Sequence, residues 1–329
     1  MSGNMPRRLV LVGGAAVAVR PGAVRAQPQP GAWPTQPLKL VVPYAPGGTT
    51  DLVARLVAQG LGERLGQPVV IENRPGAGAT LGSQAVAEAR ADGSTLVMSN
   101  IASHAISPAL YPNLRYDPVR DFAHVALVVT NPSVFVANKD FAPRDLQQVV
   151  ALSKTQPRGV AIASSGAGST NHLLIVQFAQ VTGANINHVP YRGAGPAMTD
   201  VIAGTVPLMS DSLPSAAGHI RAGTVRALAM ASATRHPAFP DVPTFREQGV
   251  DLSSDSWFGI SAPAGTPPAV VARLNSEVRA VLATPEARGR LAELGGTPGD
   301  IDSAGYAAFV ATEVARWLPV VRASGATLD

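Results

Sequence analysis

The segment from Tyr44 to Asp51 (YAPGGTTD) combines residue types that suit an anion-binding loop. It follows an apolar run and precedes a segment with helical spacing, so Gly47 and Gly48 stand between an expected strand and an expected helix. The first N–H groups of a helix lack partners within the helix, and the helix dipole adds partial positive charge there. Because glycines let the backbone approach a ligand, this junction suits a carboxylate or a phosphate without an arginine. The alternative is an ordinary turn with Thr49 or Thr50 as the helix cap.

A second junction with the same order of elements lies at Ile162–Leu174 (IASSGAGSTNHLL). Gly166 and Gly168 free the loop, and Ser169 is placed to cap the helix that follows. If both helix starts lie at the carboxyl ends of their strands, they face one cleft, as open α/β sheets favour. Two converging anion sites predict a ligand with a carboxylate at one or both ends. The neutral hydrogen-bonding side chains of this junction are Ser164, Ser165, Ser169 and His172.

Two further polar positions follow expected strands. In the corner His188–Asp200 (HVPYRGAGPAMTD), Arg192 between Tyr191 and Gly193 is able to pair with a carboxylate in bidentate fashion or to be a surface arginine. Asp211, in LMSDSLPS, is able to accept from a ligand donor or to fix a loop. The residues alone leave both alternatives open.

The patterns of known catalytic and cofactor sites are missing from the sequence. Gly76, Gly78 and Gly82 loosely resemble a dinucleotide loop, but their spacing differs and the strand ending at Asn100 lacks the ribose-binding acid. There is no GxSxG elbow, no HExxH pair and no P-loop lysine, and the six histidines have no metal spacing. A chain without cysteine has no disulfide and no thiol nucleophile. We therefore expect no catalytic residue, no cofactor and no metal.

Residues 1–26 have the pattern of a cleavable signal peptide. Arg7 and Arg8 precede an apolar stretch too short to span a membrane, and small residues lead to Ala26. The chain has 26 Lys+Arg and 22 Asp+Glu, and the arginines of residues 1–26 account for the whole net charge of +4. The mature chain is therefore formally neutral, which argues against binding to nucleic acid or to an anionic membrane surface. Export without cysteine favours the bacterial periplasm.

Apolar runs of strand character alternate with segments of helical spacing through the mature chain, and this predicts an α/β fold with mostly parallel sheets covered by helices. Strands are expected at residues 39–43, 69–71, 95–98, 159–163, 186–189, 206–209, 225–231 and 257–263. Helices are expected at residues 52–65, 81–90, 145–155, 171–182, 196–203, 216–222, 268–294 and 303–321.

The run Phe122–Asn138 is longer than the other β-rich segments and is broken in sequence by Asn131-Pro132. We expect it to leave one sheet and enter another, and we expect the strand at 225–231 to return to the first sheet. This predicts two domains after an extended leader at 27–36. The first is discontinuous (37–130 plus 232–329), and the second is 131–231. Two chain crossings then form a hinge, and the cleft between the domains is the expected ligand site.

Several segments occur in the order seen in one known family. They are PLKLVVPYAPGGTTD, LGQPVVIENRPGAGATLGSQAVAEARADGSTL, SSGAGSTNHL, HVPYRGAGPAMTD, VRALAMAS with Arg235, FPDVPTFREQGV and WFGISAPAGTP. In these segments the chain resembles the Bug (TctC-like) receptors, the periplasmic solute-binding proteins of tripartite tricarboxylate transporters. The resemblance implies a two-domain type II periplasmic-binding-protein fold with hinge crossovers, which closes on a small carboxylate and delivers it to a membrane permease.

The resemblance also implies which residues bind the ligand, since members of the family hold the ligand's carboxylate largely through backbone amides and bridging waters. Two departures concern the pocket. Family loops often read GGNxGA where this chain has Gly78-Ala79-Thr80-Leu81-Gly82, and Ser210 replaces an aromatic residue of many relatives, which is expected to enlarge or wet the pocket. The expected ligand-binding residues are Tyr44, Pro46, Gly47, Gly48, Thr49, Thr50, Asp51, Ser165, Gly166, Gly168, Ser169, His172, Tyr191, Arg192, Gly193 and Asp211.

These observations together predict a monomeric receptor that is exported to the periplasm and does not span the membrane. It captures a small organic carboxylate, and the ligand favours the closed form over the open form. Its expected partners are this ligand and the subunits of a membrane permease, with no nucleic acid among them. The alternatives are an exported enzyme that acts on a small carboxylate in the same cleft, and a ligand sensor without a transport role.

Overall fold

A computed structural model describes residues 1–3 and 33–324, with side chains described as far as Arg322. The predicted cleavage site and most of the predicted leader lie outside the described residues. The chain divides between Trp33 and Pro34, and the fold below belongs to the residues from Pro34 onward. Among the described residues, no helix is long and apolar enough to cross a membrane.

The strands are β1 (Leu38–Val42), β2 (Val69–Asn73), β3 (Thr95–Asn100), β4 (Phe122–Asn138), β5 (Val160–Ser164), β6 (Ile186–Pro190), β7 (Leu208–Ser212), β8 (Val225–Met230), β9 (Asp255–Pro263) and β10 (Thr297–Pro298). They pair in the order β2-β1-β3-β9-β4-β7-β5-β6, and β8 and β10 also pair with β4. Pairings that involve β4 or β9 are antiparallel, and the remaining ones are parallel. The predicted α/β class is confirmed, but the sheet is mixed rather than mostly parallel, because β4 and β9 run antiparallel to their neighbours.

The long strand β4 passes from one part of the sheet to the other, as predicted. Its residues 122–132 pair with β9, and its residues 133–138 pair with β7 and β8. Asn131 and Pro132 do not interrupt the strand, because they pair with Ser256 and Asp255 at the end of the β9 ladder. The loss of one N–H at a proline is tolerated where a strand changes partners.

The prediction that the strand at 225–231 returns to the first sheet is wrong. Strand β8 instead pairs antiparallel with residues 134–138 of β4, which overlap the residues 133–137 that pair with β7. The second half of β4 therefore lies between β7 and β8. Each edge of this half forms backbone hydrogen bonds with one neighbour, β7 on one side and β8 on the other. The backbone groups of β8 are therefore paired here and not in the first sheet.

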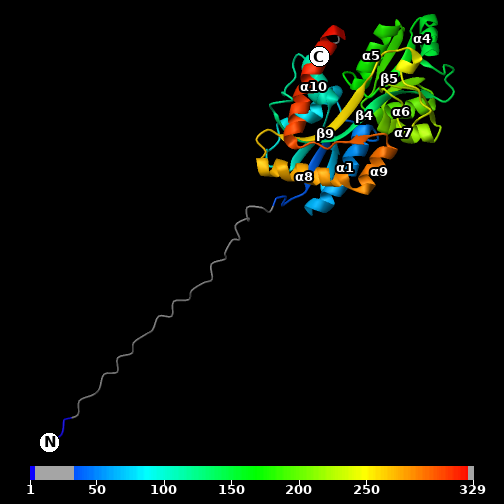
Figure 1. Cartoon of the computed structure of the whole chain (residues 1–329). Helices are drawn as coiled ribbons and strands as arrows, with labels where there is room; N and C mark the ends of the chain where they lie inside the picture. Colours follow the sequence, from blue (N-terminus) through cyan, green and yellow to red (C-terminus); the bar gives the residue numbers. More distant parts are fainter. Residues whose placement is uncertain (4–32, 325–329) are drawn as a thin grey trace. The chain divides into compact units, whose positions relative to one another are not determined.

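The α-helices are α1 (Thr49–Leu65), α2 (Thr80–Ala87), α3 (Ser107–Leu110), α4 (Leu146–Thr155), α5 (Thr170–Thr182), α6 (Ala194–Ala203), α7 (Leu213–Arg221), α8 (Pro268–Ala283), α9 (Pro285–Glu293) and α10 (Ser303–Ser324). A π-helix at Ala102–Ile106 follows β3, and 3₁₀ turns occur at Ala77–Ala79 and Arg246–Gln248. Figure 1 shows α4, α5, α6 and α7 around β5, while α8 lies beside α1.

The prediction of one helix over residues 268–294 is wrong, because the segment breaks between α8 and α9. A proline disfavours helical backbone in the residue before it, and Thr284, which precedes Pro285, is extended (φ −64°, ψ 144°). The Thr284 side chain then accepts a hydrogen bond from the Ala287 N–H and caps α9.

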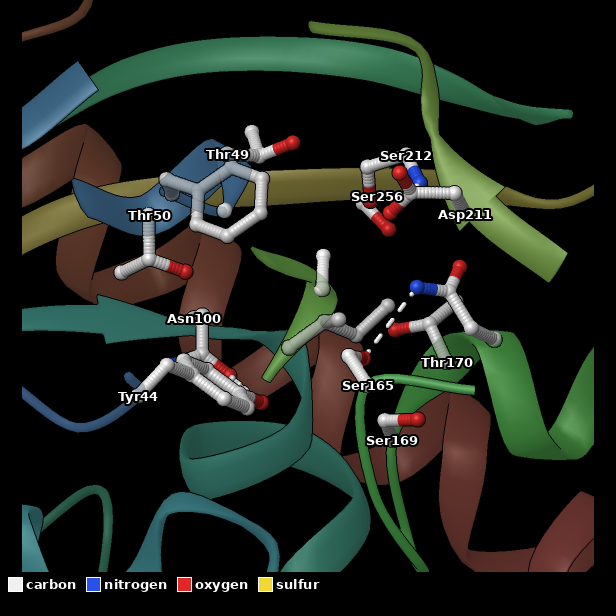
Figure 2. A pocket seen from close by; sticks show the side chains of 15 residues that line it. Tyr44, Thr49, Thr50, Asn100, Ser165, Ser169, Thr170, Asp211, Ser212 and Ser256 are labelled. Carbon is white, nitrogen blue, oxygen red and sulfur yellow. Dashed lines mark hydrogen bonds between the residues drawn. The ribbon is translucent and has the colours of Figure 1, made fainter. Parts of the chain in front are cut away.

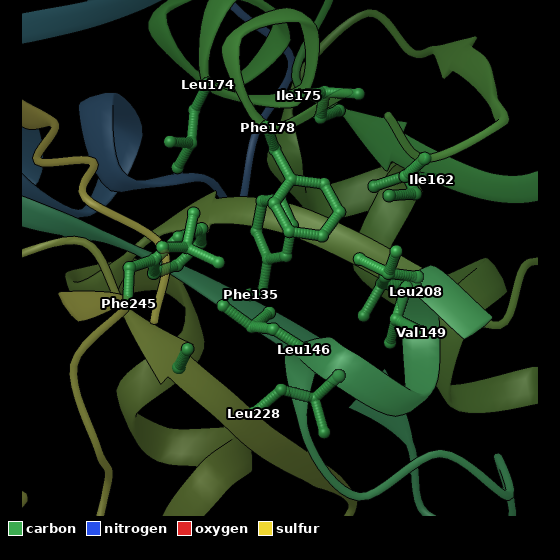
Figure 3. Packing of buried hydrophobic residues seen from close by; sticks show 14 of the residues in the cluster. Phe135, Leu146, Val149, Ile162, Leu174, Ile175, Phe178, Leu208, Leu228 and Phe245 are labelled. Carbon is green, nitrogen blue, oxygen red and sulfur yellow. The ribbon is translucent and has the colours of Figure 1, made fainter. Parts of the chain in front are cut away.

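A cluster of buried apolar side chains holds the second half of β4 against α5. Phe135 of β4 packs edge to face with Phe178 of α5 and with Phe245, at ring-centroid distances of 5.3 and 4.9 Å. Leu174, one turn before Phe178, points into the same cluster (Figure 3). Since these contacts lie along α5, they fix the direction in which its first turn points. Other members are Leu146, Val149, Ile162, Ile175, Leu208 and Leu228.

A buried polar chain joins α10 to the centre of the sheet. The Tyr306 hydroxyl lies 2.8 Å from Ser99 Oγ of β3, and Ser261 of β9 donates to Ser99 at 3.0 Å. Gly259 of β9 lies beneath the tyrosine ring, so that an added Cβ would stand 2.1 Å from the Tyr306 hydroxyl and 2.7 Å from the Ala126 carbonyl oxygen. This position therefore has no space for a side chain.

We predict that Gly259→Ala lowers the free energy of unfolding by about 1–3 kcal/mol, because overpacking displaces Tyr306 and its hydrogen bonds. The matched control is Gly289→Ala in α9, where an added Cβ meets nothing within 4 Å. That variant gains about 0.5–1 kcal/mol from helix propensity. Urea unfolding of the two variants measures both values, and equal effects would contradict this account of the packing.

Candidate ligand-binding site

A cavity lies between the first turns of α1 and α5, the ends of β3 and β7 and the start of β9 (Figure 2). It leaves about 400 Å³ between the atoms of its walls, counting the part open to solvent. The lining residues are Tyr44, Gly48, Thr49, Thr50, Asn100, Ile101, Ser165, Ser169, Thr170, Asn171, Ala194, Asp211, Ser212, Ser256 and Phe258.

The start of α1 presents backbone donors that no side chain caps. Gly47 takes a left-handed conformation (φ +88°), and Gly48 is the N-cap, extended and without a side-chain hydrogen bond. Thr49 and Thr50 are thus first-turn residues, which excludes the alternative in which one of them caps the helix. Both are buried in the cavity wall. The first N–H groups of this helix are therefore available to an anion.

Asp51 stabilises this loop without lining the cavity. Its carboxylate accepts two hydrogen bonds from Arg55, at 2.9 and 3.0 Å, one from Asn73 at 3.0 Å and one from the Gly47 N–H at 3.1 Å. Burial acts to raise the pKa of Asp51, but the hydrogen bonds from Arg55, Asn73 and Gly47 outweigh it and the pKa is lowered. Asp51 is therefore a charged support for the glycine loop.

The start of α5 is capped as predicted. Ser169 accepts from the His172 N–H at 3.2 Å and donates to the Gly166 carbonyl oxygen at 2.7 Å. His172 does not line the cavity. Its Nδ1 accepts from the Gly168 N–H at 3.1 Å, and its ring stacks on His188 at a centroid distance of 4.1 Å. The side chains of this loop that reach the cavity are Ser165, Ser169, Thr170 and Asn171.

Asp211 alone, among the described residues that line the cavity, carries an acidic or basic side chain. It is fully buried, and burial raises its pKa to about 7 despite hydrogen bonds from Ser215 and the Ser212 N–H. Ser215 Oγ lies 2.6 Å from the carboxylate and 3.0 Å from Thr49 Oγ1, so a chain of hydroxyls links Asp211 to the start of α1.

The remaining predicted residues divide between a second cavity and a contact beside it. The second cavity leaves about 620 Å³ between the atoms of its walls, counting the part open to solvent. It is lined by Gly166, Tyr191 and Arg192 among others, and it shares Tyr44 and Ser165 with the first. Pro46, Gly47 and Gly193 lie where the loop before α1 meets the loop before α6. There the Ala45 N–H donates to the Arg192 carbonyl oxygen at 3.0 Å, and an added Cβ on Gly195 would stand 2.3 Å from the Pro46 carbonyl oxygen.

Several cavity residues escape prediction from the sequence. Asn100 ends β3, beyond the predicted strand 95–98, and its position at the carboxyl end of a strand is the signal that would have found it. Ser256 and Phe258 lie at the start of β9, where only pairing with β4 reveals that they form the floor. The others are Ile101, Thr170, Asn171, Ala194 and Ser212.

The cavity wall offers hydrogen bonds from neutral side chains. Among the described residues, the hydroxyls of Thr50, Thr170, Ser212 and Ser256 have no hydrogen-bond partner in the protein, and no serine of the wall is hydrogen-bonded to a histidine ring. No group of three or more His, Asp or Glu suited to a metal occurs in this part of the chain. The site is thus built to bind through neutral donors.

Solved structures are similar to this chain over most of its length. The structure of the periplasmic binding protein BugD is 34% identical and covers 90% of this chain and 99% of that one, with a TM-score of 0.86. MatC of Rhodopseudomonas palustris with bound malate is 36% identical, over 88% of this chain and 100% of that one, with a TM-score of 0.84. R. palustris Rpa4515 with adipate is 36% identical, over 90% and 100%, with a TM-score of 0.86.

The family model of the tripartite tricarboxylate transporter family receptor, TctC, matches residues 53–326. The predicted resemblance and the predicted periplasmic-binding-protein fold are therefore confirmed. The chain belongs to the TctC family of tripartite tricarboxylate transporter receptors.

Proposed function

We propose that this protein is a periplasmic receptor that captures a small organic carboxylate in the cavity and presents it to a membrane permease. The observation that carries the proposal is the uncapped start of α1, which opens into a wall of unpartnered hydroxyls. Neutral donors that need no reorganisation are able to hold a carboxylate without a cation. The malate in MatC and the adipate in Rpa4515 favour a small dicarboxylate as the ligand.

We also propose that the ligand is held between two lobes, residues 37–130 plus 232–329 and residues 131–231, each of which supplies one helix start. The first lobe contributes Gly48–Thr50 and the second contributes Ser169–Asn171. The Ala45–Arg192 hydrogen bond and the Gly195–Pro46 approach join the two lobes at the rim of the cavity. Closure of the rim shields the ligand from water, and it strengthens each hydrogen bond to it.

A thermal-shift screen of the chain from Gln27 tests the proposed ligand class. We expect malate, adipate or another small carboxylate to raise the melting temperature, since a ligand that binds only the folded state stabilises it by mass action. Ser169→Ala removes the cap of α5 and its donor and should weaken that shift. A shift with nucleotides but with no carboxylate would overturn the proposal. Recovery of a chemically altered ligand would favour the enzyme alternative.

Asp211 makes the affinity depend on pH. Its pKa is raised to about 7 in the free protein, so it is neutral below that pH and charged above it. A bound carboxylate favours the neutral form, and binding above pH 7 takes up a proton. We expect the dissociation constant of a dicarboxylate to rise toward about tenfold per pH unit above 7.

The Asp211→Asn variant is the control, because it stays neutral and should bind with little dependence on pH. Isothermal titration calorimetry at pH 6, 7 and 8 measures both proteins. Tighter binding by the natural protein at high pH would mean that charged Asp211 accepts from a hydroxyl or ammonium group of the ligand. No dependence on pH in either protein would place Asp211 outside the ligand contacts.

Gly195→Ala tests closure of the rim. Its Cβ would meet the Pro46 carbonyl oxygen, so we expect the two loops to stay apart and the affinity to fall at least about tenfold. Gly218→Ala, also in a helix but with nothing within 4 Å, is the matched control and should bind normally. Small-angle scattering should show a smaller radius of gyration on ligand addition for the control alone. Equal contraction in both variants would contradict rim closure.

A further inference from the structure

Asn100 is a residue of the cavity wall, and its side chain has a buried donor with no partner. The residue is 2% exposed, and its Nδ2 makes no hydrogen bond to any described residue. Other buried polar atoms without a partner are found on His104, His124, Asn131, Ser210 and Arg226, and none of those residues lines this cavity. Since buried polar groups are almost always paired in native proteins, a lone donor on a residue of the cavity wall points to a partner that comes from outside the chain.

The orientation of the Asn100 amide is fixed by its own backbone surroundings. Its Oδ1 accepts from the N–H groups of Ala102 and Ser103, at 3.0 and 3.2 Å, where the π-helix begins. Tyr44 also points its hydroxyl at this oxygen, at 3.5 Å. If the amide were flipped, Nδ2 would face two N–H donors, which excludes that arrangement. The N–H groups of Nδ2 are therefore directed away from the π-helix.

The position of Asn100 in the sheet places this donor at one end of the cavity floor. Asn100 is the last residue of β3 and pairs with Phe258 of β9, whereas Asp211 lies on β7 beside Val134 of β4. Figure 2 shows Asn100 and Tyr44 on one side of the cavity and Asp211, Ser212 and Ser256 on the other. The two ends of a dicarboxylate would therefore meet different groups. The Asn100 amide nitrogen donates at every pH, whereas Asp211 is able to donate only when it is protonated.

We propose that Asn100 is a ligand-binding residue whose Nδ2 donates to an ionised carboxylate of the ligand, and that it sets the selectivity of this end of the cavity for an anion. The inference rests on the function proposed above. The hydrogen bonds from Ala102 and Ser103 already fix the orientation of the Asn100 amide. Binding of a carboxylate oxygen to Nδ2 therefore has no further cost in side-chain entropy for this residue. A neutral ligand group that only donates would leave Nδ2 unpaired, and the cavity would discriminate against it.

Asn100→Asp is the decisive variant, because Asp keeps the oxygen that Ala102 and Ser103 need and replaces the donor with a second oxygen. The probe is whichever of malate and adipate binds the natural protein more tightly. At pH 8 we expect the variant to bind at least about a hundredfold more weakly, since like charges then meet. As the pH falls to 5, the new carboxyl regains a proton and a donor, and the ratio of the two dissociation constants should shrink. Burial holds Tyr44 neutral throughout by raising its pKa, and Asp211 is common to both proteins.

Asn131→Asp is the matched control, because Asn131 is also buried but lies outside this cavity. It should bind the probe within about twofold of the natural protein, while Asn100→Ala should lose about tenfold or more at every pH. Binding of Asn100→Asp within twofold of the natural protein, or an equal loss in Asn131→Asp, would overturn the role of Asn100 and leave the carboxylate receptor intact. Failure of the natural protein to bind any carboxylate would overturn both proposals.

Discussion

The pairing of one strand with two sets of partners is the constraint on which the rest of the structure depends. Residues 122–132 of β4 pair with β9, and residues 133–138 pair with β7 and β8. Because the same strand belongs to both parts of the sheet, the carboxyl ends of β1 and β3 and those of β5 and β7 meet at one place. Helix starts that follow parallel strands then converge, as they do at the switch points of open α/β sheets. The cavity is a consequence of this topology.

The two helix starts that meet there are not equivalent. The start of α5 is already satisfied by Ser169, whereas the start of α1 has a glycine cap and keeps its donors free. Asp51 holds the α1 loop in place through Arg55 and Asn73, so the charges of this region are balanced within the protein. A ligand carboxylate therefore meets oriented dipoles and hydroxyls, which carry less desolvation cost than a buried ion pair. Selectivity must then come from hydrogen-bond pattern and shape.

Local sequence predicts those parts of the site that depend on local chemistry. Glycine pairs before a helix and the Ser169 cap are visible as residue types, and the structure places Gly48, Thr49, Thr50, Ser165 and Ser169 in the wall. Residues that reach the cavity through long-range pairing, such as Ser256 and Phe258, carry no such pattern. The wrong prediction that β8 returns to the first sheet has the same origin, since the strand with which it pairs is decided by long-range tertiary contacts. The broken helix at Thr284 was readable, because a proline disfavours helical backbone before it.

Asn100 shows why an unpaired buried group is more informative than a motif. A motif reports residue types that many folds use for turns and caps, so its chemistry stays ambiguous until the partners are known. An amide whose oxygen is fully engaged and whose nitrogen is empty at a cavity wall has only one kind of partner left, an acceptor. Ser210 is the contrasting case. Its buried hydroxyl is also unpartnered, but Ser210 does not line this cavity, and nothing there directs the hydroxyl toward a ligand. A missing hydrogen-bond partner therefore points to ligand binding at Asn100, whereas at Ser210 it means only a local loss of stability.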